Sequence, residues 1–153
     1  MSYTDYIFDD YRRRCADLEA STNVFAKGIA WVGENYVPVA EAKIPLLDQG
    51  FLKSDLTYDV PAVWNGRFFR LDDHLDRFEA SMKKLRMTSP IPRQEIRDRL
   101  VEMTALSGIR DAYVMMFMTR GLRYVRQYAP EDCPNHCYLM VTPYLWVMGE
   151  EVQ

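Results

Sequence analysis

The sequence lacks any apolar run of about 18 residues, the length that a membrane-spanning helix needs. Its first residues, MSYTDYIFDDYRRR, are acidic and aromatic and then basic, without the apolar centre of a signal peptide. Positive charge is not in excess, because the formal net charge is −3, whereas a general nucleic-acid binder has a basic face. We therefore expect a cytoplasmic protein that binds neither membranes nor nucleic acid.

Cysteine is also scarce. Cys15, Cys133 and Cys137 make an odd count, which is typical of free thiols in a reducing compartment. The segment CPNHC places His136 beside two of them, but its spacing fits no standard zinc pattern, and only Cys15 could supply a distant fourth ligand. We interpret this segment as a polar loop that enters a strand and expect no metal site.

The 153 residues, of which 48% are hydrophobic, suffice for one globular domain with a real core. Near the N-terminus we expect an arm or helix around Tyr6 to Leu18. GIAWVGENYVPV predicts a hairpin of Ile29 to Val32 and Tyr36 to Val39, with a turn at residues 33–35. AEAKIPLLDQG is then expected to form a connection that ends at Gly50.

A second hairpin is predicted in LTYDVPAVWNGRFFRL. Asn65 and Gly66 suit a type I′ turn between two strands rich in aromatic and β-branched residues. Pro61 cannot donate a ladder hydrogen bond, so its strand must be an edge strand or be bulged there.

Two amphipathic helices follow. Asp72 or Asp73 is expected to cap the first, whose apolar positions recur at helical spacing: Leu71, Leu75, Phe78, Met82 and Leu85. The second runs from Arg93 to Ser107 through Ile96, Leu100 and Met103, and Gly108 ends it.

DAYVMMFMT and CYLMVTPYLWVM predict two further strands, separated by a loop over residues 120–136. The order of elements predicts an α+β fold, with an antiparallel sheet and two main helices on one side. We divide the chain into an N-terminal arm or helix (1–25), a small α+β domain (26–119), the loop (120–136), and the last strand with the start of a connection to a further domain (137–153).

Arg77 lies one turn into the first of these helices, where cations are normally disfavoured. Two explanations remain open: an ion pair with Asp73, four residues earlier, or an anion site shared by the arginine and the helix start. His74 lies three residues before Arg77 on the same face and can address the same point.

Several segments give the chain a family resemblance, in order and over nearly its whole length: DQGF, SDLTYDV, FFRLDDHLDR, SGIRDAYV, TRGL and PYLWVM. With these segments the chain resembles the fold-type IV pyridoxal-phosphate enzymes, which include branched-chain and D-amino-acid aminotransferases. It is most similar to the fungal R-selective amine transaminases within that family.

The resemblance implies pyridoxal 5'-phosphate as the cofactor, with Arg77 gripping its phosphate. From the sequence alone we expect His74 to be a buried, hydrogen-bonded support that orients its neighbours, with catalysis as the alternative. In the family a lysine of a C-terminal domain holds the cofactor as a Schiff base. None of the five lysines here aligns with it, so that lysine is expected beyond Gln153, and the segment alone should not transaminate. A homodimer with a shared pocket is also implied.

The same resemblance assigns a substrate pocket, for which plain core packing is the alternative at each apolar position: Lys53, Tyr58, Val60, Tyr113, Met115, Arg126, Leu145 and Val147. Lys53 stands where the family usually has histidine. Arg126 matches a loop arginine that binds the carboxylate of the keto acid, whereas a solvated basic loop is the alternative for Arg120, Arg123 and Arg126.

These implications predict a transaminase that moves an amino group from an (R)-configured primary amine to a keto acid such as pyruvate. Within the fold, a D-amino-acid or branched-chain aminotransferase is the alternative. A truncated, non-catalytic module that binds a partner or a small anion is the alternative of another class.

Overall fold

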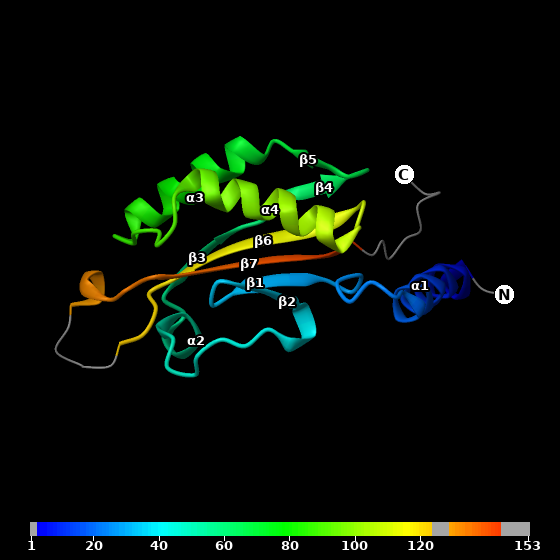
Figure 1. The fold of residues 1–153 in the computed structure, drawn as a ribbon, viewed down its shortest axis with the longest axis horizontal. Coiled ribbons are helices and arrows are strands. Elements are labelled where there is room, and N and C mark those ends of the chain that lie inside the picture. The colour runs from blue at the N-terminus through cyan, green and yellow to red at the C-terminus, as the bar shows by residue number, and fades with distance from the viewer. Residues whose placement is uncertain (1–2, 124–128, 145–153) are drawn as a thin grey trace.

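The computed structural model describes residues 3–123 and 129–144, and within them seven strands form one antiparallel sheet (Figure 1). Their order is β2-β1-β7-β6-β4-β5, and β3 pairs with β6 beside β4. The strands are β1 (Ile29–Val32), β2 (Asn35–Pro38), β3 (Leu56–Asp59), β4 (Ala62–Trp64), β5 (Arg67–Phe69), β6 (Ala112–Thr119) and β7 (His136–Pro143).

Two helices, α3 (Leu71–Lys84) and α4 (Arg93–Ser107), cover one face of this sheet, while α2 (Gln49–Lys53) lies on the other side (Figure 1). The expected α+β architecture with two main helices on one side is therefore confirmed. The remaining helical elements are α1 (Tyr3–Ala20), which includes the predicted N-terminal helix, and two 3-10 turns, η1 (Val39–Glu41) and η2 (Pro130–Asp132). None of the helices in the described ranges is long and apolar enough to cross a membrane.

The two predicted hairpins are present. Asn65 and Gly66 have φ angles of 50° and 76°, and the type I′ turn requires positive values at both positions. In the first hairpin the turn is shorter than expected, because Asn35 already belongs to β2 and pairs with Val32.

Pro61 interrupts a strand without shifting its register. Asp59 pairs with Met116 and Ala62 with Tyr113, so two residues separate these pairs on each strand and no bulge is inserted. Since β3 pairs with β6 alone among the described strands, the expectation of an edge strand is confirmed.

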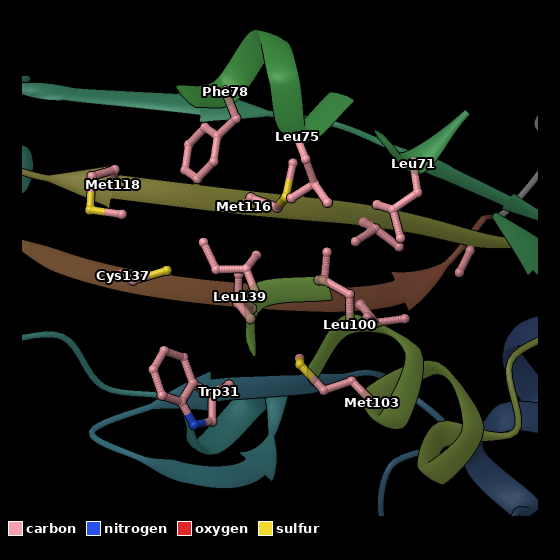
Figure 2. Packing of buried hydrophobic residues seen from close by; sticks show 14 of the residues in the cluster. Trp31, Leu71, Leu75, Phe78, Leu100, Met103, Met116, Met118, Cys137 and Leu139 are labelled. Atoms are coloured by element: carbon pink, nitrogen blue, oxygen red, sulfur yellow. The ribbon is translucent and has the colours of Figure 1, made fainter. Parts of the chain in front are cut away.

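The core lies between the sheet and the two helices (Figure 2). On α3 the predicted stripe is buried at four positions, but Leu85 is the C-terminal cap and is 40% exposed. Met116, Met118 and Leu139 of the central strands face this layer. The second helix ends as predicted at Gly108, whose φ of 68° suits glycine.

The predicted cap of α3 is wrong. Arg70 is the N-cap residue, with φ 51°, and no side chain caps the helix. Asp72 and Asp73 lie inside the first turn, where a carboxylate still interacts favourably with the helix dipole.

Candidate functional site

A buried carboxylate lies where β3 ends beside α3. Asp59 is 5% exposed, and its oxygens accept four hydrogen bonds, one of them from the backbone N–H of Val60 at 2.7 Å. Arg77 donates from Nε to Oδ2 at 2.6 Å and from Nη2 to Oδ1 at 2.8 Å. The ring Nδ1 of His74 lies 2.7 Å from Oδ1. The two residues of α3 therefore meet at one point, as their spacing predicts, and that point is Asp59.

These contacts fix the charge of Asp59. Burial by itself raises the pKa of a carboxyl group, but the hydrogen bonds from Arg77, His74 and the Val60 N–H outweigh burial and lower the pKa of Asp59. Because the carboxylate is ionised, the His74 nitrogen that faces it must bear the proton. His74 is thus the hydrogen-bonded support that the sequence indicated, with 17% of its side chain exposed.

Arg77 does not form the ion pair with Asp73 that the sequence left open. Asp73 pairs with Arg70 instead, and both of these side chains are more than half exposed. The Arg77 side chain is 66% exposed although its guanidinium is held by Asp59. Within the described residues, Nη1 of Arg77 makes no hydrogen bond or ion pair, so that side of the guanidinium faces solvent.

Four predicted pocket residues share the face of the sheet opposite α3 and α4. Tyr113 and Met115 alternate along β6 with the buried residues of the core, and Tyr58 and Val60 flank Asp59, the last residue of the edge strand. Tyr58 is 56% exposed, and its ring centroid lies 6.3 Å from that of Phe117. One short segment of chain thus presents Asp59 to α3 and two candidate pocket residues to the other face.

The other predicted site residues do not join these four on the sheet in the described part of the chain. Lys53 is exposed at the end of α2. Arg126, Leu145 and Val147 lie outside the described residues. A mostly apolar hollow of about 410 Å³ does open on this face, but no predicted pocket residue that the structure describes lines it. It is lined by residues including Ala30, Phe51, Leu56, Phe117, Tyr138 and Met140.

Comparison with known proteins identifies the family. The model of the family described as "Amino-transferase class IV" matches residues 56–153. This chain belongs to the class IV aminotransferases.

Two curated relatives illustrate this membership. The D-alanine aminotransferase of Listeria monocytogenes serotype 1/2a (strain 10403S) is 31% identical over 104 residues, which cover 67% of this chain and 36% of the relative. The branched-chain-amino-acid aminotransferase-like protein 2 of Arabidopsis thaliana is 29% identical over 117 residues, or 76% of this chain and 21% of the relative. This chain thus spans only about a third of the length of the D-alanine aminotransferase that it matches.

Solved structures share the fold. The branched-chain aminotransferase of the thermophilic archaeon Thermoproteus uzoniensis, solved with norvaline, has a TM-score of 0.60 at 21% identity, covering 76% of this chain and 40% of that one. A fold IV-transaminase from Curtobacterium pusillum has a TM-score of 0.62 at 15% identity, covering 76% and 43%. At these identities the likeness concerns the fold.

Besides the cluster at Asp59, the structure contains a second ionic cluster, at Arg120, that the sequence did not predict. Arg120 is 6% exposed, so it does not belong to a solvated loop, which corrects one of the two alternatives for this residue. Its guanidinium contacts Asp55 through Nε at 3.0 Å and Nη2 at 3.2 Å. It also donates to the backbone oxygens of Leu85 at 2.8 Å and Arg86 at 3.1 Å, just past the end of α3.

Asp48 of the DQGF segment forms a third cluster. It is fully buried and accepts from the Gly50 N–H, Thr119 Oγ1 and Tyr138 OH at 2.8, 2.9 and 2.8 Å, while His136 Nδ1 lies 3.0 Å away. Burial and the bond to Asp48 raise the pKa of Tyr138. A Cβ at Gly50 would lie 2.6 Å from the Thr119 methyl group, so this close approach requires glycine.

His136 and the buried Cys133 and Cys137 do not form a metal site with one another. Within the described ranges no group of three or more His, Cys, Asp or Glu side chains is arranged to hold a metal ion. His136 is the first residue of β7 and faces Asp48, as expected for a polar segment that enters a strand.

Proposed function

We propose that the complete protein transfers an amino group from an (R)-configured primary amine to a keto acid such as pyruvate, with pyridoxal 5'-phosphate as cofactor. In this proposal residues 26–119 are its small domain, and residues 120–153 supply a loop, a strand and the start of the connection to the domain with the cofactor lysine. A homodimer would share the pocket across its interface. Membership of the class IV aminotransferases supports the reaction class.

The single observation that best supports the cofactor assignment is the guanidinium of Arg77. It is held at one edge by Asp59 and is open to solvent at Nη1, which fits a doubly charged phosphate group. Bound there, pyridoxal 5'-phosphate would supply the electron sink that lets an amino group leave one carbon and join another.

The chain's own residues would then bind and orient the substrate. Tyr58, Val60, Tyr113 and Met115 form one wall and exclude water from the reacting carbon. The donor amine has no carboxylate whereas the keto acid has one, so an arginine must approach only for the second substrate. In our proposal Arg126 performs this task from the loop after β6.

Substrate comparison tests the donor class. The complete protein should convert (R)-1-phenylethylamine faster than D-alanine or leucine, measured as pyruvate-dependent or 2-oxoglutarate-dependent amine loss. Faster turnover of D-alanine would establish the D-amino-acid alternative, which the 31% identity to the Listeria D-alanine aminotransferase favours. Faster turnover of leucine would establish the branched-chain alternative.

Cofactor binding tests the alternative of a non-catalytic module. Arg77→Ala should weaken binding of pyridoxal 5'-phosphate about thirtyfold or more, the scale of a lost charge-assisted contact, and Arg77→Lys should restore only part of it. Fluorescence titration of the complete protein measures both. Unchanged affinity in Arg77→Ala would remove Arg77 from the site, and a wild type that binds no cofactor would leave the non-catalytic module.

A further inference from the structure

We propose that Asp59 is a positioning residue, which holds the Nε–Nη2 edge of the Arg77 guanidinium so that Nη1 is presented to a phosphate dianion. This inference rests on the proposed function, in which Arg77 binds the cofactor phosphate. The proposed function gives no task to Asp59, a buried acid. Its side chain faces α3, and its negative charge would repel a bound phosphate.

The contact between the two residues is side-on. Nε and Nη2 of Arg77 bind the two oxygens of one carboxylate, at 2.6 and 2.8 Å. A guanidinium has five N–H donors in a rigid plane, and Nη2 also lies 3.1 Å from Nδ1 of His74. The two hydrogens of Nη1 are therefore the donors that have no partner among the described residues. These Nη1 donors belong to the part of the guanidinium fork that Asp59 does not bind, and phosphate oxygens can accept from them.

Asp59 is suited to this task because it is itself fixed. It is 5% exposed and also accepts hydrogen bonds from the Val60 backbone and from His74, so its carboxylate cannot follow Arg77 into solvent. Arg77, in contrast, is 66% exposed and has a long side chain with many rotamers. The fixed acid therefore selects one of these rotamers before the ligand arrives, which lowers the ordering required on binding.

Charge and positioning predict opposite effects, and this makes the inference testable. Asp59 has a negative charge in contact with Arg77, so by charge alone its neutralisation should strengthen the binding of a dianion. If Asp59 orients the fork, its neutralisation should weaken binding. Asp59→Asn keeps the size of the side chain and removes the charge, whereas Asp59→Glu keeps the charge and moves the carboxylate by one methylene.

The experiment compares pyridoxal 5'-phosphate with pyridoxal, which lacks the phosphate, on the complete protein. Dissociation constants come from fluorescence titration of wild type, Asp59→Asn, Asp59→Glu, Arg77→Ala and the double variant Asp59→Asn/Arg77→Ala. Asp73→Asn is the matched control, because Asp73 is an acid in the first turn of α3, one turn before Arg77, but pairs with Arg70 and not with Arg77. The phosphorus NMR shift of the bound cofactor reports the phosphate contact directly, and thermal unfolding shows that each variant is folded.

We expect Asp59→Asn and Asp59→Glu each to weaken binding of pyridoxal 5'-phosphate about tenfold, with pyridoxal changed less than about twofold. In the Arg77→Ala background Asp59→Asn should have no further effect, since it acts through Arg77. Asp73→Asn should match the wild type. If only Asp59→Glu remains folded, its loss of phosphate-dependent affinity decides the question.

Two results would overturn the inference while leaving the proposed function intact. In one, Arg77→Ala weakens cofactor binding but Asp59→Asn strengthens it or leaves it unchanged. In the other, the Asp59 variants weaken pyridoxal and pyridoxal 5'-phosphate equally, which indicates a general structural role. Equal cofactor affinity in wild type and Arg77→Ala would instead refute the phosphate role of Arg77 and the inference with it.

Discussion

Replacement of Arg120 by methionine should destabilise the fold strongly. The arginine side chain is 7% exposed and donates to Asp55 and to the backbone oxygens of Leu85 and Arg86. Methionine keeps much of the apolar stem but supplies no donor, so the two carbonyl groups and one carboxylate lose their partner.

The magnitude follows from the exposure of those groups. Removing one member of a fully buried ion pair costs about 3–5 kcal/mol. Asp55 is 32% exposed, so water can solvate part of the released charge, and we expect a loss of about 2–4 kcal/mol. For a chain of this size that corresponds to a fall in the melting temperature of roughly 5–15 °C.

Thermal and urea unfolding, followed by circular dichroism, measure the loss. Glu131→Gln is the control, because it removes the partner of the exposed Arg86 side chain, which is 3.6 Å away and 79% exposed. That change should cost less than about 0.5 kcal/mol. An Arg120→Met variant as stable as this control would show that the cluster at Arg120 contributes nothing to the fold.

Three further outcomes are expected. Arg126→Ala should raise the Michaelis constant for pyruvate by the equivalent of roughly 2–4 kcal/mol and leave the amine half-reaction within a few-fold; equal damage to both would give Arg126 a structural role. Burial raises the pKa of the Cys137 thiol to about 12, so a thiol reagent at neutral pH should label Cys15 first and Cys137 only as fast as the protein unfolds. The pKa of Asp59 is lower in the folded state than in the unfolded state. The ionised carboxylate therefore stabilises the fold fully above the ordinary carboxyl pKa, and this stabilisation is lost as the pH falls. The unfolding free energy of the wild type, relative to that of Asp59→Asn, should decrease from about pH 6 to pH 3.

The elements that the sequence predicted well depend on neighbours along the chain. The turn at Asn65 and Gly66 needs only two residues that tolerate positive φ, and the buried stripe of α3 needs only apolar residues at helical spacing. The prediction failed where the surrounding structure decides. Arg70 takes the cap position because the chain turns there from β5 into α3, so the acids that normally favour a cap fall inside the first turn.

The ionic clusters were not predictable in the same way. Asp59 meets Arg77 across 18 positions, and Asp48 meets Tyr138 across 90, so no local period links them. One signal was available: an acid between Tyr58 and Val60, in the phase of a strand that faces the core, must find partners or remain unpaired at high cost. That signal indicates that a partner exists, but the partner's identity requires the fold.

The positions of two of these clusters explain how an edge strand can support a binding site. Among the described strands β3 pairs with β6 alone, and α3 packs against β3 from the face to which the Asp59 side chain points (Figure 1). Asp55, just before β3, is tied through Arg120 to the chain that follows α3, while Asp59, at its end, is tied to His74 and Arg77 in the first half of α3. The strand is thus held to the helix at both ends by charged contacts in place of a second ladder.

This arrangement separates two tasks along one segment. The side chain of Asp59 is engaged with α3, whereas those of Tyr58 and Val60 point to the opposite face of the sheet. Changes in the size of these two candidate pocket residues therefore need not disturb the arginine that we assign to the phosphate. In the proposed enzyme such a strand would allow the substrate wall to vary while the proposed phosphate contact of Arg77 stays in place.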